Sequence, residues 1–511
     1  MKPVTVIGLD GATWKILNSL FDDGELPNLC GIGNNGFSGS LYSTVPSRTS
    51  PAIPSLYTGC DPSELGFVGF TKPNGATITT IDINLPRIWT VLDHHGIRST
   101  IANVRTTFPP DEIDGIIISG DPAPGEDSNY VHPANIHKNI EGFRAETLDK
   151  RRHQELVPAS NHAEEVTDIS VEIMNRRFET FLELLADRNH TFNMFWIGGT
   201  DFLQHRLWDR PNQIKRFYKE VDKNIGRVLK ATAGDIFVLS DHGFSEPSEF
   251  GFHINEWLLR NGYLKLYGGK IGTQLIQTGQ KYARKYVPAV YLQKLLDLQD
   301  GSSFDESDPP WFDRSYKNIP GVKPSSIAQL ASSSGIDINA AGDDRKKIAK
   351  EIINKLKSLQ LPSGEPAIVD AWLPEDLYDG GRFIDELPDV MFQANEYVGV
   401  DPQISGKIFS DRTSDRADHI HARNGVWMGC GPRIDVSGET VDARITDVTP
   451  TILHMLSVPI GEGMQGSVQT KLISNKEPPT SENYRREFKK HSLNKNDQEE
   501  MEQWLSDMGY I

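Results

Sequence analysis

This chain of 511 residues lacks the features that would place it in a membrane or in an oxidising compartment. Its three cysteines, at positions 30, 60 and 430, form no CxxC pair, and so sparse and odd a count argues against a disulfide framework. No run of 18 or more apolar residues occurs, so no segment is typical of a membrane span. The first residues enter a strand-like pattern directly, without the apolar region and small-residue cleavage site of a secretory signal. We therefore expect a cytoplasmic protein with no membrane partner.

Positive charge is also scarce relative to negative charge. The chain has 53 Lys and Arg against 70 Asp and Glu, a formal net charge of -17. This balance disfavours non-specific binding to nucleic acid. It does not exclude an anionic substrate, because bound divalent cations reverse the local potential. Composition therefore predicts a soluble acidic globular protein and leaves its chemistry open.

Short apolar runs rich in β-branched residues alternate with helical patterns along the chain. The runs, which we expect to be buried strands, are residues 4–9, 100–104, 116–119, 192–197 and 236–239. Residues 212–230 carry an apolar stripe at helical spacing, and residues 346–359 carry a similar one. This alternation predicts an α/β fold with a mostly parallel central sheet and helices on both faces.

Two segments differ in character from this alternating pattern. Residues 268–334 mix basic residues, a Pro-Pro pair and runs of serine and aspartate, which predicts an insertion or cap. Residues 474–511 are strongly polar and are expected to end in a helix. The predicted organisation is a catalytic α/β domain at 1–267 and 335–473, the cap at 268–334, and the polar tail.

Three of the expected strands end in side chains that bind metal ions. The strand at 4–9 is followed by Asp10. The strand at 192–197 is followed by Asp201 and His205, and the strand at 236–239 is followed by Asp241 and His242. Singly, each has an ordinary alternative, such as a helix cap, a turn former or a helical surface pair. Together they meet at one edge, because the carboxyl ends of parallel strands are where α/β sheets bind ligands. Carboxylates and imidazoles suit Zn²⁺ or Mn²⁺, so the pattern predicts a metal site.

A later segment offers one more imidazole. His419 and His421 precede an apolar run at 426–428, and either could be the ligand. His421 is preferred because its spacing to Gly425 matches a motif of the family that the chain resembles.

Residues 44–62 supply a nucleophile, and here the chain resembles a known family. It is similar to the alkaline phosphatase superfamily, in particular its type I phosphodiesterase and nucleotide pyrophosphatase branch. The nucleophile motifs are Thr-x-Pro at 49–51, Thr-Gly-x-x-Pro at 58–62 and a glycine at 66. The metal motifs are Gly-Leu-Asp-Gly at 8–11, Asp-x-x-x-His at 201–205, Ser-Asp-His-Gly at 240–243 and His-x-x-x-Gly at 421–425. The resemblance covers residues 3 to 435 and follows the family's order.

The resemblance implies an alkaline-phosphatase-like fold and a metal-dependent hydrolase of phosphodiester or pyrophosphate bonds. Thr49 would be the nucleophile and would form a phospho-threonine intermediate. Asp10, Thr49, Asp241 and His242 would hold one of two divalent ions, and Asp201, His205 and His421 would hold the other. Zn²⁺ is the expected metal, with Mn²⁺ as the alternative. The expected partner is a small phosphorylated substrate such as a nucleotide or nucleotide conjugate.

The chain departs from the family's pattern near its phosphate contacts. Leu65 stands where the family has histidine, and Phe70 stands where it has an asparagine that helps to hold a phosphate oxygen. Phosphate contacts must then come from other residues. The candidate substrate contacts are Arg48, Phe70 and Arg105.

Other functions are compatible with parts of this pattern. Residues 44–48, Thr-Val-Pro-Ser-Arg, look like a sulfatase signature, but Thr44 cannot replace the Cys or Ser that becomes formylglycine. A phosphomonoesterase or a phosphomutase of the same superfamily remains an alternative, although phosphomutases usually have a serine nucleophile. A non-catalytic binding protein would be favoured by gaps in the ligand set, and the set has none.

Overall fold

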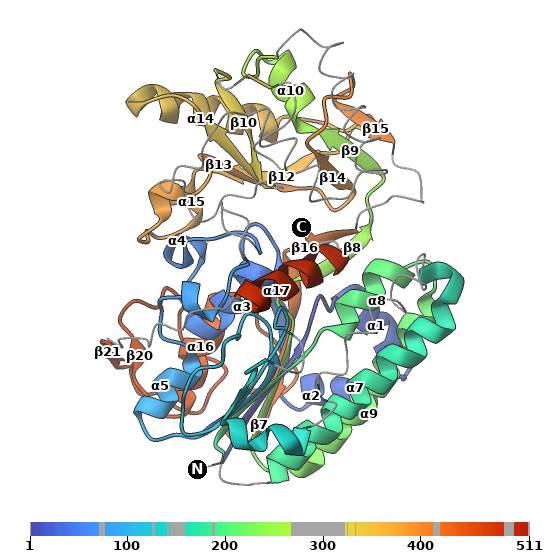
Figure 1. The fold of residues 1–511 in the computed structure, drawn as a ribbon, viewed down its shortest axis with the longest axis vertical. Coiled ribbons are helices and arrows are strands. Elements are labelled where there is room, and N and C mark those ends of the chain that lie inside the picture. Colours follow the sequence, from blue (N-terminus) through green and yellow to red (C-terminus); the bar gives the residue numbers. More distant parts are fainter. Residues whose placement is uncertain are drawn as a thin grey trace. The chain divides into compact units, whose positions relative to one another are not determined.

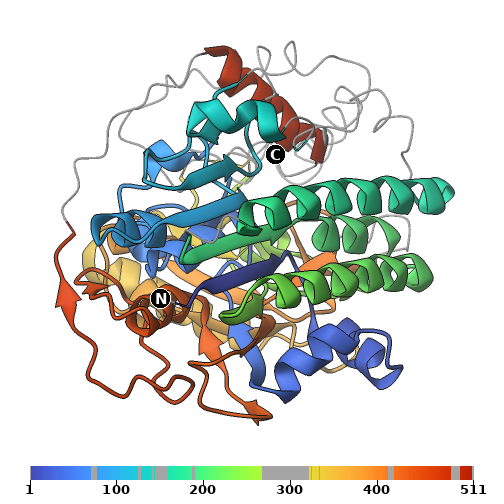
Figure 2. The same cartoon turned by 90° about the horizontal axis from the view of Figure 1, so that it is seen from below.

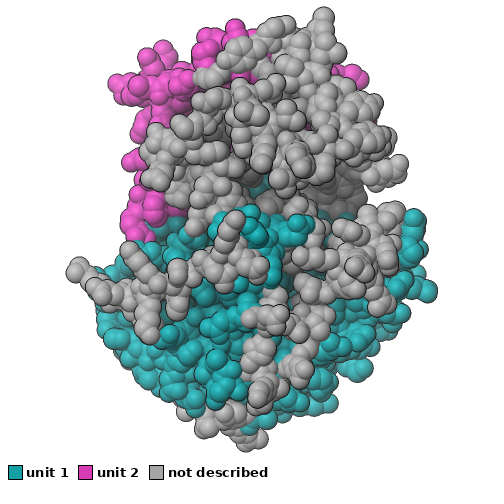
Figure 3. Space-filling view, viewed as in Figure 1, with its two compact units in different colours: residues 1–65, 77–246, 421–510 teal, residues 66–76, 247–420, 511 magenta. Residues whose placement is uncertain are grey.

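A ten-stranded sheet runs through the first of two compact units into which the chain divides (Figures 1 and 3). This computed structural model describes residues 2–70, 77–124, 128–140, 143, 159–186, 190–266, 322–323, 325–332, 334–411, 419–484 and 495–508. The first unit contains residues 1–65, 77–246 and 421–510, and the second contains residues 66–76 and 247–420.

The strand order of the large sheet is β18-β2-β17-β7-β1-β6-β3-β4-β5, with β19 also paired to β2. Its strands are β1 (Val4–Leu9), β2 (Phe37–Tyr42), β3 (Ser99–Val104), β4 (Ile116–Ser119), β5 (Val131–His132), β6 (Phe192–Ile197), β7 (Asp235–Leu239), β17 (Asn424–Cys430), β18 (Glu439–Thr440) and β19 (Ala443–Arg444). The central pairs β7-β1, β1-β6, β6-β3 and β3-β4 are parallel. β17 is antiparallel to both β2 and β7.

Helices cover both faces of this sheet (Figures 1 and 2). One face carries α1 (Trp14–Asp22), α2 (Pro27–Asn34), α7 (Ala163–Ala186), α8 (Gly199–Leu207) and α9 (Pro211–Ala231). The other carries α3 (Thr49–Thr58), α5 (Ile88–His94) and α16 (Val448–Met455). The predicted α/β fold with a mostly parallel sheet is therefore confirmed.

Several short elements and one longer helix lie wholly or partly in the first unit, whose boundaries at residues 246 and 421 fall within β8 and β16. They are α4 (Pro62–Leu65), η1 (Thr80–Asp82), η2 (Ala134–Ile140), η3 (Ala159–His162), β8 (Gly243–Pro247), β16 (His419–Ala422), η6 (Ile445–Asp447), β20 (Ile460–Gly461), β21 (Ser481–Glu482) and α17 (Lys495–Met508).

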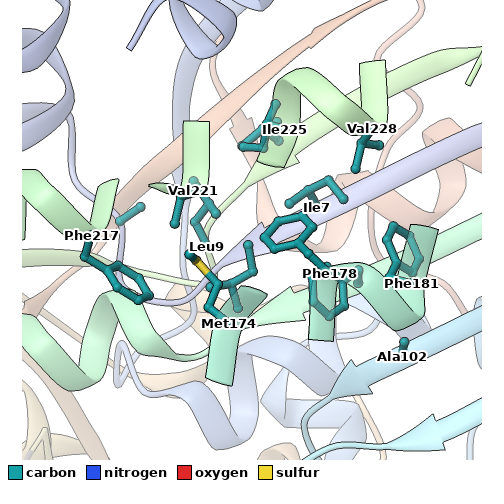
Figure 4. Close-up of a cluster of buried hydrophobic side chains, with 14 of the residues drawn as sticks. Ile7, Leu9, Ala102, Met174, Phe178, Phe181, Phe217, Val221, Ile225 and Val228 are labelled. Carbon is teal, nitrogen blue, oxygen red and sulfur yellow. The ribbon is translucent and has the colours of Figure 1, made fainter. Parts of the chain in front are cut away.

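The core of the first unit explains why its strands read as continuous apolar runs. All six residues of β1 are buried, because helices pack over both of its faces. Figure 4 shows Ile7 and Leu9 of β1 gathered with Met174 and Phe178 of α7 and with residues of α9. The stripe on α9 consists of Ile214, Phe217, Val221, Ile225 and Val228, all buried. Burial of each such side chain contributes about 1.5–3 kcal/mol, which holds the central strands in register.

The second unit has its own core and two smaller sheets. The four-stranded sheet has the order β10-β11-β13-β12, and the three-stranded sheet has the order β14-β9-β15. The elements are β9 (Phe250–His253), α10 (Ile254–Arg260), β10 (Ala328–Ser332), β11 (Gly335–Ile338), α14 (Gly342–Lys357), β12 (Ile368–Trp372), α15 (Pro374–Leu377), η4 (Ile384–Glu386), β13 (Val390–Ala394), β14 (Val398–Asp401) and β15 (Phe409–Asp411). Ile352 and Leu356 of α14 are fully buried in this core.

The predicted cap at 268–334 falls mostly outside the described residues. Its described end includes β10, which forms an antiparallel pair with β11 at 335–338. The compact units divide near residues 246 and 420 instead of at 267 and 334. The cap, and the domain boundaries drawn around it, stay predictions.

No helix among the described residues has both the length and the apolar character needed to cross a bilayer. Cys60 is buried and Cys30 and Cys430 are half-buried, and all three are free thiols.

Candidate active site

The expected metal-binding side chains lie at one edge of the large sheet. Asp10 directly follows β1, Asp241 and His242 lie just beyond β7, and Asp201 lies in the first turn of α8, which follows β6. His421 reaches this edge by a different route. It precedes β17, which is antiparallel to β7, so the amino end of β17 lies beside the carboxyl end of β7.

A glycine allows the loops after these strands to approach one another closely. Gly11 has a φ of 62°, in the left-handed region that other residues rarely adopt. A Cβ atom there would lie 2.9 Å from Oδ1 of Asp201 and 3.2 Å from Cε1 of His242. The amide of Gly11 donates a hydrogen bond of 3.2 Å to Oδ1 of Asp241. The first metal motif therefore needs glycine after its aspartate for steric and conformational reasons.

The first cluster of metal-binding groups consists of Asp10, Asp241 and His242. Their ligand atoms lie within 4.8 Å of one another, and all three side chains are fully buried. Nε2 of His242 lies 3.4 Å from Oδ2 of Asp241 and 3.7 Å from Oδ1 of Asp10. The hydroxyl of Thr49 joins them, with Oγ1 3.1 Å from Nε2 of His242 and 3.5 Å from Oδ1 of Asp10.

The electrostatics of this first cluster favour a bound cation. Burial, and then the negative charge of Asp241, raise the pKa of Asp10 to about 8, although Arg105 opposes the shift. Burial lowers the pKa of His242, but Asp241 and the other nearby carboxylates outweigh it and raise this pKa overall. Two carboxylates confined this closely cannot both ionise easily without compensating positive charge, which a divalent ion would supply.

The second cluster consists of Asp201, His205 and His421. Their ligand atoms also lie within 4.8 Å of one another. Oδ1 of Asp201 is 3.3 Å from Nε2 of His205 and 3.6 Å from Nε2 of His421. Asp201 and His205 stand one turn apart on α8, so a single short helix presents two of the three ligands. The rings of His242 and His421 stack with their centroids 3.8 Å apart, so the two clusters adjoin.

The charge states in the second cluster suit metal ligands. Burial raises the pKa of Asp201, but the imidazoles of His205 and His421 outweigh it and hold this pKa well below its usual range. Burial, together with the charges of His242 and Arg48, holds the pKa of His421 well below its ordinary value. His421 is therefore neutral near pH 7, as a metal ligand must be.

Backbone carbonyls orient two of the histidines. Nδ1 of His242 donates to the carbonyl of Gly243 at 2.9 Å, and Nδ1 of His421 donates to the carbonyl of Ser47 at 3.1 Å. In each ring Nε2 is then the nitrogen that faces the carboxylates and is available to a metal ion. Such outer contacts are typical of histidines that bind metals.

Several buried carboxylate oxygens at this edge accept no hydrogen bond. They are both oxygens of Asp201 and Oδ2 of Asp241. Burying an unpaired carboxylate oxygen is costly, and native structures rarely contain one without a reason. A cation in each cluster would satisfy these oxygens, so the residues present fit the two divalent ions that the family resemblance implies.

The position of Thr49 sets it apart from the neighbouring hydroxyls. It is the first residue of α3, 1% exposed, and lies where the helix dipole favours negative charge. The hydroxyl of Thr44 instead donates to the carbonyl of Pro46, and that of Ser47 donates to the carbonyl of Thr44. Thr49 is thus the hydroxyl of this loop that the structure brings against the metal-binding side chains.

The three candidate substrate contacts have different surroundings. Nε of Arg105 lies 2.8 Å from Oδ2 of Asp10, so this guanidinium forms an ion pair with a carboxylate of the first cluster. Arg48 is half-buried and immediately precedes Thr49. Phe70 is buried and belongs to the second unit. Their roles in binding substrate stay predictions. The side chain of His419, the alternative ligand, lies outside the described residues.

A tryptophan that no sequence motif predicted also contacts the first cluster. Nε1 of Trp196 donates to Oδ2 of Asp10 at 3.2 Å. Trp196 lies opposite Gly8 in the β1-β6 pair, and a Cβ atom on Gly8 would lie 1.9 Å from Cε3 of the indole. A glycine inside a buried strand often marks such a close approach, and this signal was present in the sequence.

The fold is alkaline-phosphatase-like, and two clusters of side chains that could hold a metal ion lie at one edge of its sheet. The chain belongs to the type I phosphodiesterase/nucleotide pyrophosphatase family, whose model matches residues 4–427. The family resemblance in the sequence motifs and the prediction of an enzyme are thereby confirmed.

Solved structures share the fold at low sequence identity. Phosphonoacetate hydrolase from Sinorhizobium meliloti in complex with phosphonoacetate gives a TM-score of 0.52 at 14% identity, covering 88% of this chain and 94% of that one. The same enzyme in complex with phosphonoformate gives 0.51 at 14% identity, with the same coverage. Human ectonucleotide pyrophosphatase/phosphodiesterase 5 gives 0.48 at 12% identity, covering 93% of this chain and 100% of that one. Among curated protein sequences, none matches.

Proposed function

We propose that this protein is a two-metal hydrolase that cleaves phosphodiester or pyrophosphate bonds through a covalent phospho-threonine on Thr49. The observation that carries the proposal is the position of the Thr49 hydroxyl. It lies 3.1 Å from Nε2 of His242 and 3.5 Å from Oδ1 of Asp10, at the start of a buried helix.

The ligand assignment follows the two clusters. Asp10, Thr49, Asp241 and His242 would hold one divalent ion, and Asp201, His205 and His421 would hold the other. The mixed oxygen and nitrogen donors suit Zn²⁺, with Mn²⁺ as the alternative. When bound, these cations lower the pKa of hydroxyl groups beside them and offset negative charge on phosphate oxygens.

The chain's own groups then have distinct tasks in the reaction. Oγ1 of Thr49 attacks phosphorus, a bond forms between that oxygen and phosphorus, and the bond to the leaving-group oxygen breaks. The amino end of α3 favours the negative charge that gathers on the threonine oxygen and on the phosphoryl group. A water molecule then attacks the phospho-threonine, which releases phosphate or a phosphate monoester and restores the hydroxyl.

The charges near Thr49 favour substrates with two ester substituents on phosphorus. A monoester carries an additional negative charge, and sites that prefer monoesters usually add a cationic clamp beside the metals. Arg105 forms an ion pair with Asp10, and this pairing offsets part of the positive charge of Arg105. Arg48 immediately precedes the nucleophile in the chain, and the single negative charge of a diester needs less compensating positive charge than the charge of a monoester does. A small phosphorylated molecule such as a nucleotide conjugate is the proposed substrate class.

The alternatives within the superfamily differ in substrate and acceptor. A phosphomonoesterase would prefer the doubly charged ester, and a phosphomutase would return the phosphoryl group to another hydroxyl instead of water. A non-catalytic binding protein is disfavoured because both ligand clusters are complete in the described residues.

The test compares kcat/KM for bis(4-nitrophenyl) phosphate and 4-nitrophenyl phosphate at equal metal content. We expect the diester to be cleaved faster, and cleavage of both to disappear in Thr49→Ala if the rates come from this site. A preference of about ten-fold or more for the monoester, about 1.4 kcal/mol, would identify a phosphatase instead.

A further inference from the structure

A third group of metal-binding side chains lies at the opposite edge of the large sheet. His94 ends α5, His95 follows it, and Glu482 belongs to β21. Their ligand atoms lie within 4.8 Å of one another. His95 comes just before the first residue of β3, Ser99, whereas the catalytic side chains follow the last residues of β1, β6 and β7. The group is therefore separate from the proposed two-metal centre.

Two distances within this group fit ligands that share one cation, with each imidazole facing a different oxygen of the same carboxylate. Nε2 of His94 lies 3.4 Å from Oε1 of Glu482, and Nε2 of His95 lies 3.4 Å from Oε2. These separations exceed the range of about 2.7–3.2 Å typical of N–H···O hydrogen bonds. In a tetrahedral zinc site with bonds of about 2.0–2.1 Å, neighbouring ligand atoms lie about 3.3–3.4 Å apart. Two imidazoles and a carboxylate are also ligands that zinc favours.

The backbone holds the ligands from both sides. Glu482 pairs with Gly461 in the β20-β21 ladder, and its carbonyl accepts a hydrogen bond of 3.1 Å from the amide of Glu462. His95 is fixed at the end of α5 by hydrogen bonds from its amide to the carbonyls of Leu92 and Val91, at 3.0 and 3.3 Å. Little backbone ordering is then required when a metal binds.

The contact between Tyr484 and His95 determines which nitrogen of His95 carries the proton in the metal-free form. Its hydroxyl donates to the carbonyl of Pro459 at 2.7 Å and lies 3.0 Å from Nε2 of His95. Because the phenol has one proton, Nε2 of His95 is the donor in the metal-free form. A metal ion would require that proton to move to Nδ1 or to solvent, which neutral imidazole permits.

We propose that His94, His95 and Glu482 form a zinc site that cross-links residues 481–484 to the end of α5. The side chains are 62%, 27% and 39% exposed, so the ion exchanges with solvent and water fills the remaining position. The site has three protein ligands and stabilises the fold around β21 without contacting substrate.

The test counts zinc bound to the holoenzyme by equilibrium dialysis and metal analysis. We expect wild type to bind one zinc more than His95→Ala or Glu482→Gln, while kcat/KM of both variants stays within about two-fold of wild type. Zinc should also raise the unfolding midpoint of the wild type more than that of the variants. His162→Ala is the matched control, because His162 is exposed and has one carboxylate, that of Glu165, at 3.9 Å.

The result that overturns the proposal is equal zinc content in wild type, His95→Ala and Glu482→Gln. This outcome is distinguishable from failure of the proposed function. If the catalytic clusters bound no metal, wild type would hold one zinc, and that ion would still disappear in His95→Ala.

Discussion

Replacing Thr49 by alanine tests the covalent route most directly. The substitution removes the oxygen that lies 3.1 Å from Nε2 of His242 and 3.5 Å from Oδ1 of Asp10. The nearby hydroxyls of Thr44 and Ser47 do not replace it, because they donate to backbone carbonyls. We expect kcat/KM to fall by more than about 10³-fold, or about 4 kcal/mol of transition-state stabilisation.

The same substitution should leave the fold intact. Thr49 is 1% exposed, and losing its hydroxyl and methyl groups removes two hydrogen bonds and a small buried volume. The expected cost is about 1–2 kcal/mol, which an ordinary domain tolerates. Metal analysis should accordingly find nearly unchanged metal content, so that the loss of activity is not a loss of metal.

The assay measures kcat/KM on a diester at matched metal content and traps the phosphorylated enzyme by acid quench. Wild type should yield a peptide in which Thr49 carries the phosphoryl group with the remaining ester substituent of the diester, and Thr49→Ala should yield no such adduct. Thr49→Ser is the matched control, because it keeps a hydroxyl and should retain activity to within about ten-fold. Turnover by Thr49→Ala within about ten-fold of wild type, with both metals bound, would refute the reasoning and assign the attack to another group.

Three further predictions follow from the site. Chelation should abolish activity, and Zn²⁺ or Mn²⁺ should restore it. His205→Ala should retain about one metal per chain instead of two. Full activity in metal-free protein would contradict the two-metal mechanism. Because the pKa of Asp10 is raised from 3.8 to about 8, its contribution to stability is present below pH 3.8 and is lost as the pH rises to about 8. Metal-depleted protein should therefore unfold at lower urea concentration at pH 8 than at pH 7, and Asp10→Asn should weaken this trend; a rise in stability over that range would count against it. Gly8→Ala places a Cβ 1.9 Å from the ring of Trp196, so it should lower the free energy of unfolding by about 1–3 kcal/mol and reduce metal content. Gly463→Ala, which meets nothing within 4 Å, is the control, and equal effects of the two would refute the packing argument.

Local sequence patterns were sufficient to predict the central strands of the large sheet and a helix that covers it. The expected strand at 4–9 is β1, that at 192–197 is β6, and that at 236–239 lies within β7. The stripe at 212–230 lies within α9, which spans Pro211–Ala231. These predictions succeed because a strand buried on both faces must be apolar throughout and a covering helix must be apolar every three or four residues. Both signals lie within a few neighbouring residues.

The sequence also determined which chemistry was available. Carboxylates and imidazoles that follow parallel strands must gather at one edge, since the strands share a direction. The sequence alone therefore predicted that Asp10, Asp201 and Asp241 lie together, and the order of the motifs indicated the family. The histidine from the later segment was harder to place, because His421 precedes an antiparallel strand and its route to the edge depends on how β17 pairs.

Only the tertiary structure decided how these groups contact one another. The ion pair of Arg105 with Asp10, the indole of Trp196 opposite Gly8, and the carbonyl of Ser47 that orients His421 join residues far apart in the chain. So does the third histidine-containing group, which brings residues 94–95 to residue 482. No periodicity or local motif encodes such contacts, because they depend on strand order and on the packing of loops. The sequence therefore determined which donors the protein has, and folding decided which of them lie close enough together to share a metal ion.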